Sequence, residues 1–322
     1  MSWFWFSIIA LLCWSGSDFF SKIGCRDADD KLSHLKMVIA VGTVMGLHAA
    51  FEIFVSGTAI SWSVIWTYLP VSLLYIGSMT LGYLGLRYIE LSVSSPICNS
   101  SGALVAVLTL VFVGGDDYSP LALFAILLVC AGAIGLGVVD ATEDPELRAE
   151  RQKDGNYKYA KSFLALALPV AYCLLDAAGT FADNRVLEIL TDRFLAAGMA
   201  ATRKECVDLA AASANCAYEL TFLAAAVVCF IYVVLIRKDK LIPRLEGPKY
   251  LGAICETAGQ FAYIYAIADT SHLAMSAPII ASYCAASVLW SRLFLKEKLS
   301  WKHYGMIGLI VIGIALMGML DL

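Results

Sequence analysis

The segment YLGLRYIELSVSSP (83–96) has a counterpart in the second half of the chain, YAIADTSHLAMSAP (265–278). Each segment runs from the end of one apolar stretch through a very short polar turn into the next stretch, which carries a Pro near its start. Four further residues recur in the same order at constant spacing: Ser119, Gly132, Gly137 and Asp140 match Ser300, Gly313, Gly318 and Asp321. Self-similarity at a fixed period is the signature of an internal repeat. We therefore expect two copies of one structural unit.

Apolar residues dominate the sequence around these segments. Hydrophobic residues make up 60% of the chain and charged residues 16%, and the mean hydropathy is +0.75. A soluble domain carries about a quarter charged residues, because its surface must face water. Lipid accepts a surface without them, and within lipid only helices or closed barrels satisfy their backbone hydrogen bonds. The apolar runs are unbroken rather than alternating, so we predict an all-α integral membrane protein.

About ten runs have the length of roughly 20 residues that a transmembrane helix needs. They lie near residues 3–24, 34–56, 64–88, 93–113, 119–139, 161–181, 218–236, 249–269, 272–294 and 302–320. We expect a first five-helix repeat at residues 1–140, a polar linker at 141–160 and a second five-helix repeat at 161–322. Within the second repeat, residues 182–217 form a long connection, whose apolar spacing indicates an amphipathic helix at the membrane surface.

An odd number of crossings in each repeat has a topological consequence. The second copy must enter the membrane upside down, which gives two inverted five-helix repeats. Many secondary transporters are built in this way, with the substrate site near the midplane between the repeats. The predicted function is therefore secondary transport of a small organic metabolite by alternating access, with protons as a candidate coupling ion.

The segment MSAPIIASYCAASVLWSRLFLKEKLSWKHYGMIGLIVIGIALMGM (275–319) resembles the closing helices of the EamA family in the drug/metabolite transporter superfamily. The shared features are Pro278 early in a span, Phe-Leu-x-Glu at Phe294–Glu297, and Gly305 and Gly313 in the last helix. The opening LLCWSGSDFFSKIG (11–24) resembles that family's first helix. The chain departs from the family pattern at Gly114, Gly115 and Asp116 and in the length of the 182–217 connection.

Positive charge is concentrated on one side of the predicted topology. The opposite side holds only four basic residues, Arg185, Arg193, Arg203 and Lys204. The positive side of a membrane protein is expected to be cytoplasmic, which places both termini outside, whereas the family resemblance implies that both are inside. If the charge rule holds, Cys206 and Cys216 face an oxidising compartment and could form a disulfide. In either orientation we expect a multi-pass protein of the cell membrane.

Ionisable residues within the predicted spans are the first candidates for a site, because each costs about 2.5–3.5 kcal/mol at the centre of a membrane helix. Asp18 and Lys22 lie four residues apart in the first span and could pair on one helix face. The pair could contact substrate in a central cavity. Alternatively, Lys22 reaches the cytoplasmic surface and Asp18 only accompanies it.

Two later spans carry polar stripes. Asp176 and Thr180 share one face of the sixth span, and Glu256, Gln260 and Tyr263 share one face of the eighth. Asp176 lies too deep to reach water easily, which favours a place in the cavity. Glu256 has no adjacent cation, so it would tend to stay protonated, as a proton-coupled carrier requires. It could equally be an inert hydrogen-bonding group.

Pro96 and Pro278 mark equivalent helix starts in the two repeats, and Asn99 and Tyr283 follow them. Bent or broken helices often line transporter cavities, although Pro near a helix start is also ordinary capping. We therefore add Asn99 and Tyr283, with Tyr83, to the candidate substrate-binding residues. Tyrosines beside acidic groups would suit an amphipathic or cationic solute.

Other classes of protein are less well supported. The sequence contains no HExxH, nucleophile elbow or P-loop, so we expect no enzyme, no metal and no cofactor. The expected partners are membrane lipid and a small-molecule solute, without nucleic acid. A second copy of the chain, forming a homodimer, is a further possible partner. A polytopic membrane enzyme and a membrane assembly or interaction protein without transport activity remain open as alternative functions.

Overall fold

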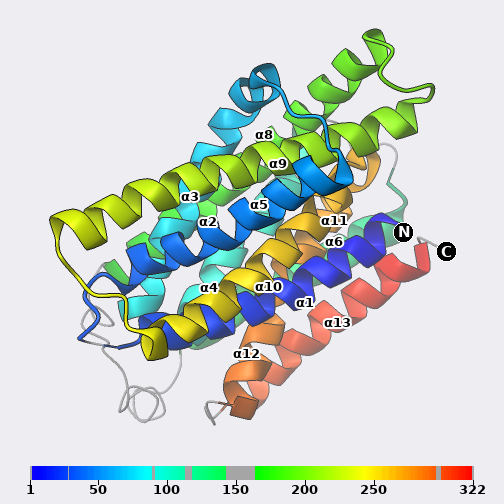
Figure 1. Cartoon of the computed structure of the whole chain (residues 1–322). Helices are drawn as coiled ribbons and strands as arrows, with labels where there is room; N and C mark the ends of the chain where they lie inside the picture. The colour runs from blue at the N-terminus through cyan, green and yellow to red at the C-terminus, as the bar shows by residue number, and fades with distance from the viewer. Residues whose placement is uncertain are drawn as a thin grey trace.

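The computed structural model describes residues 2–27, 29–88, 91–112, 118–142, 164–294 and 299–320, and these form helices without any β-strand. Figure 1 shows the helices lying side by side in one bundle. This arrangement confirms the predicted all-α fold. Gly114–Asp116, nearly all of the predicted linker at 141–160, and the Leu295–Glu297 part of the Phe-Leu-x-Glu segment lie outside the described residues.

The first half of the chain forms helices close to the predicted spans. They are α1 (Trp3–Cys25), α2 (Ser33–Phe51) with the π-helical turn η1 (Glu52–Ser56), α3 (Trp62–Tyr88), α4 (Leu91–Asn99), α5 (Ser101–Phe112) and α6 (Pro120–Ala141). The described second half contains α8 (Leu164–Ala196), α9 (Arg203–Phe230) with η3 (Ile231–Ile236), α10 (Pro243–Ile267), η4 (Thr270–His272), α11 (Leu273–Ala281), α12 (Tyr283–Phe294) and α13 (Trp301–Leu320).

Eight helical segments of the described chain are long and apolar enough to cross a membrane. α8 and α10 are not among them, although both are long enough. Their hydropathy is lowered by polar residues such as Asp176, Asp183, Glu256 and Gln260, most of which turn inward rather than toward lipid. Helix length and composition therefore account for eight of the roughly ten predicted spans.

The segment at 182–217 differs from its prediction as a long connection. Residues 182–196 continue α8 and residues 203–217 begin α9, so the connection itself is only 197–202. Charged residues on the outer turns end the apolar runs without ending the helices. A 33-residue helix is about 50 Å long, against about 30 Å of bilayer core. The α8–α9 hairpin accordingly extends past its neighbours in Figure 1.

The disulfide left open between Cys206 and Cys216 is excluded by the same helix. Both residues lie in α9, where ten residues correspond to about 15 Å of rise. A disulfide requires Cα atoms within about 7 Å of each other. Both thiols are buried and free.

Helices of the first half pack mainly against helices of the second. α1 packs against α10, α3 against α8, α2 against α9, and α6 against α13, while α4 and α5 meet α12 and α11. The centre of the bundle is therefore an interface between the two halves. Gly318 lies against Phe4, and the two chain ends are neighbours in Figure 1.

Two broken helices cross at this interface, and their bounds recur exactly. α4 and α5 span 91–99 and 101–112, and α11 and α12 span 273–281 and 283–294, so each bound recurs 182 residues later. The same offset relates Tyr83 to Tyr265 and Pro96 to Pro278. The internal similarity of the sequence thus extends to where these helices begin, break and end.

Candidate functional site

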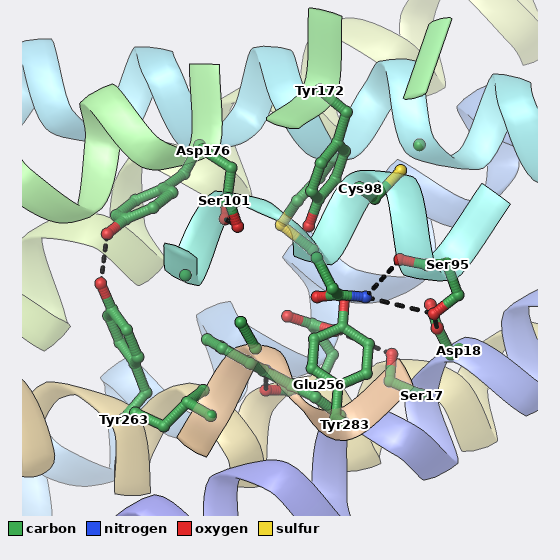
Figure 2. A pocket seen from close by; sticks show the side chains of 18 of the residues that line it. Ser17, Asp18, Ser95, Cys98, Ser101, Tyr172, Asp176, Glu256, Tyr263 and Tyr283 are labelled. Carbon is green, nitrogen blue, oxygen red and sulfur yellow. Dashed lines mark hydrogen bonds between the residues drawn. The ribbon is translucent and has the colours of Figure 1, made fainter. Parts of the chain in front are cut away.

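A cavity lies between the two halves, lined by residues of α1, α3, α4, α5, α8, α9, α10, α11 and α12. Figure 2 shows its polar side chains converging from opposite walls. Nine of the ten residues predicted from the sequence line this single cavity: Asp18, Tyr83, Asn99, Asp176, Thr180, Glu256, Gln260, Tyr263 and Tyr283. The structure therefore brings together positions that are up to 265 residues apart in the sequence.

Lys22 is the exception. It does not line the cavity, and its ammonium group donates a hydrogen bond to the carbonyl oxygen of Leu86 at 2.7 Å. Asp18 instead accepts hydrogen bonds from Ser95 at 2.5 Å and Ser287 at 3.1 Å. The predicted Asp18–Lys22 pair does not form, because hydroxyl groups from α4 and α12 reach the carboxyl while the lysine extends toward the end of α3.

The other two carboxyl groups of the cavity are held in the same manner. Ser101 donates to Oδ2 of Asp176 at 2.7 Å, and Ser17 donates to Oε2 of Glu256 at 2.8 Å. For all three carboxyl groups, the hydrogen bonds among described residues go to one oxygen only. Each group is therefore fixed in orientation by serine while its second oxygen stays open to a ligand.

Aromatic rings form much of the remaining wall. The Trp14 ring lies 5.0 Å from the ring of Tyr263 and 6.0 Å from that of Tyr283, measured between centroids. Tyr172 enters the cavity from α8, opposite Tyr283 in Figure 2. The cavity thus offers flat apolar faces as well as carboxyl oxygens.

A cluster of hydroxyl groups bounds the cavity at one end. The Tyr75 and Tyr263 hydroxyl groups share a hydrogen bond, and each hydroxyl oxygen lies 3.2 Å from Oγ1 of Thr180. Tyr75 also lies 3.3 Å from Oδ2 of Asp183, which is fully buried one turn beyond Thr180. We call Tyr75, Thr180, Asp183 and Tyr263 the hydroxyl cluster.

Buried charges lie beyond the opposite end. The carboxyl group of Asp30 lies 2.8 Å from the Lys36 ammonium and 2.9 Å from that of Lys249, and Arg87 donates to its backbone carbonyl. Burial raises the pKa of Asp30, but the hydrogen bonds and charges of Lys36 and Lys249 outweigh it and hold the pKa below its usual value. We call Asp30, Lys36, Arg87 and Lys249 the ionic cluster.

Where the broken helices cross, their close approach requires a glycine at position 102. A Cβ atom on Gly102 would lie 2.8 Å from the Ala277 carbonyl oxygen and 3.1 Å from the Cα atom of Pro278. Only a residue without a side chain lets α5 approach α11 this closely. The neighbouring residue on α5, Ser101, donates to Asp176 of α8.

Several lining residues were not predicted from the sequence. They include Ser17, Ser95 and Ser101, which donate to the carboxyl groups, and the aromatic residues Trp14, Tyr75, Tyr172 and Tyr218. Serine is common in membrane helices, so its presence gives no signal without the fold. Among the described residues, no group of three or more His, Cys, Asp or Glu side chains is placed to hold a metal ion.

Comparisons with known proteins agree with the fold. No curated protein matches the chain. A solved structure titled "Crystal structure of protein" matches 99% of this chain and 96% of its own with a TM-score of 0.60 and 14% identity, which concerns the fold alone. The family model described as EamA-like transporter family matches residues 194–319. This match agrees with the resemblance seen in the sequence: residues 194–319 are similar to the EamA-like transporter family, which belongs to the drug/metabolite transporter superfamily.

Proposed function

We propose that this protein is a secondary transporter of the cell membrane that moves a small organic solute through the central cavity by alternating access. The observation that carries this proposal is the cavity itself, which lies where helices of the two halves meet and gathers three carboxyl groups. Transporters with two related halves place their substrate sites at such an interface. The EamA-like domain supports the same class of function.

The packing of the halves supports an inverted repeat of five spans plus five. In such a repeat α1 corresponds to α8, α2 to α9, α3 to α10 and α6 to α13. A two-fold axis between the halves then relates the α1–α10 contact to the α8–α3 contact. The same axis leaves the α2–α9 and α6–α13 contacts unchanged. All four pairs are among the main contacts of the bundle. In this proposal α8 and α10 complete the ten spans.

The two clusters that flank the cavity supply contacts that could open in turn. Lys249 of the ionic cluster and Tyr263 of the hydroxyl cluster are 14 residues apart on α10, which is about 21 Å of helix. Glu256 lies midway between them. Alternating access requires that the contacts on one side separate while those on the other stay closed, and neither cluster is covalently tied.

Proton coupling follows from the carboxyl groups in this proposal. An unpaired carboxylate inside the membrane is costly, so each group is best neutralised in every state, either by a proton or by a solute. Asp18, Asp176 and Glu256 line the same cavity. Exchange of protons for solute at this set would couple the two fluxes.

Flux from proteoliposomes tests the proposal. Vesicles are loaded with an equimolar panel of amines, carboxylic acids, amino acids and neutral aromatic alcohols, and the released solutes are quantified by mass spectrometry with and without a pH gradient. We expect selective release of one class, accelerated by the gradient and reduced at least tenfold in Glu256→Gln and Asp176→Asn. Asp192→Asn serves as the control, since Asp192 is exposed in an ion pair with Arg203. Release that matches protein-free vesicles for every class would contradict the proposal.

A further inference from the structure

The charge of the cavity lining is one-sided. Asp18, Asp176 and Glu256 line it, whereas none of the described lining residues is Lys, Arg or His. An anionic solute would meet three acidic groups and no compensating charge. A cationic solute could instead replace the protons on these groups. The lining therefore favours a cation over an anion.

Unpartnered polar atoms indicate that a ligand belongs here. Gln260 is 3% exposed and Tyr83 is 6% exposed, and both side chains line the cavity. The Gln260 amide nitrogen and the Tyr83 hydroxyl are buried without a hydrogen-bond partner. Buried polar atoms without a partner are rare in native proteins, so these two atoms mark this part of the cavity as a place for a polar ligand.

The aromatic wall favours an organic cation over an inorganic one. Hard metal ions prefer shells of six or more oxygen ligands, and the described carboxyl groups are not clustered in that way. An ammonium group is instead attracted to the faces of Trp and Tyr rings. Trp14, Tyr263 and Tyr283 lie close together beside the carboxyl groups.

We propose that the cavity binds a small organic ammonium ion with a flat apolar body, its charge held by the open oxygens of Asp18, Asp176 and Glu256. This inference rests on the proposed transport function for its biological use, but it concerns binding alone. The apolar body would lie against Trp14 and Tyr283. Hydrogen bonds from Ser17, Ser95, Ser101 and Ser287 keep the carboxyl oxygens in place before the solute arrives.

Calorimetric titration of the purified full-length protein with four matched solutes tests the proposal. The solutes are phenethylamine, benzyltrimethylammonium, 2-phenylethanol and phenylacetate, with sodium chloride as the inorganic control. Because a hydrogen bond or ion contact to a charged group changes affinity by about tenfold to a hundredfold, the two cations should bind at least tenfold more tightly than the alcohol and the acid. Equal or tighter binding of 2-phenylethanol, phenylacetate or sodium ion would overturn the proposal.

Variants locate the site. Asp176→Asn should weaken binding of benzyltrimethylammonium at least tenfold, and Asp192→Asn should leave it unchanged. If Asp176→Asn does not fold, Asp176→Glu takes its place; it keeps the charge and should bind benzyltrimethylammonium measurably. The comparison of solutes on the unmodified protein needs no variant. Unchanged affinity in a folded Asp176→Asn variant, together with unchanged affinity in Glu256→Gln, would overturn the assignment.

The outcomes also separate this inference from the transport proposal. Tight cation binding without flux of either cation would retain the binding inference and contradict transport. Flux of a neutral or acidic solute without cation binding would retain transport and contradict the binding inference.

Discussion

Replacing Asp30 by Asn should destabilise the protein strongly. The Asp30 side chain is 1% exposed and neutralises two ammonium groups, those of Lys249 (0% exposed) and Lys36 (2% exposed). Removing one partner of a buried ion pair typically costs about 3–5 kcal/mol, because the remaining charge stays buried without compensation. Lys249 would still lie 3.4 Å from Glu246, and Lys36 would still lie 3.5 Å from Asp239. We therefore expect a loss near the lower limit, about 3 kcal/mol.

The assay is unfolding in mixed micelles by an increasing fraction of denaturing detergent, followed by tryptophan fluorescence. The matched control is Asp192→Asn, whose side chain is 60% exposed in its pair with Arg203. An exposed ion pair contributes about 0–1 kcal/mol, so the control should change the free energy of unfolding by no more than that. A loss for Asp30→Asn as small as the control's would refute the reasoning.

The pH dependence of the same variant gives a second readout. The neighbouring ammonium groups hold the pKa of Asp30 below its usual value in the folded protein, so the charged form is stabilised by folding. This stabilisation is complete above the ordinary aspartate pKa of about 3.9. It is lost as the pH falls through the lower folded value. The difference between the unmodified protein and Asp30→Asn should therefore be constant from neutral pH down to about pH 5, and it should disappear only at lower pH.

Three further predictions concern other parts of the bundle. Gly102→Ala places a methyl group 2.8 Å from a backbone carbonyl oxygen of α11 and should cost about 1–3 kcal/mol, whereas Gly308→Ala, with no neighbour within 4 Å, should cost nothing in the same unfolding assay. Tyr263→Phe removes a hydroxyl group with two partners and should cost about 1 kcal/mol; no loss would contradict the hydroxyl cluster. Cys206 and Cys216 should resist alkylation in the folded protein and react after denaturation without reductant; a requirement for reductant would contradict their placement on one helix.

The helices of the first half were predictable from the sequence to within a few residues, because an apolar run of about 20 residues has few alternatives in a membrane. α8 and α9 were predicted too short, because the prediction ended each span where its apolar run ends. Arg185, Glu188 and Asp192 end the apolar run, yet helical hydrogen bonding continues past them. Hydropathy detects contact with lipid and not helix length.

The candidate cavity was predictable to the extent that an ionisable group inside a membrane requires a reason. Asp18, Asp176 and Glu256 were found in this way and line one cavity. Lys22 is also an ionisable group inside a predicted span, but it does not line the cavity, because its side chain donates to the Leu86 carbonyl oxygen. The direction in which a flexible lysine side chain extends depends on the neighbouring helices, and the local sequence does not specify these.

Uptake of benzyltrimethylammonium into proteoliposomes tests the central claim most directly, because this ion carries a fixed charge and cannot carry a proton across the bilayer. The vesicles are acidic inside, and the membrane potential is held at zero with potassium and valinomycin. The account predicts accumulation of the ion as protons leave, abolished by collapse of the pH gradient and reduced at least tenfold in Glu256→Gln. Uptake no faster than in protein-free vesicles, by a preparation that binds the ion, would contradict it.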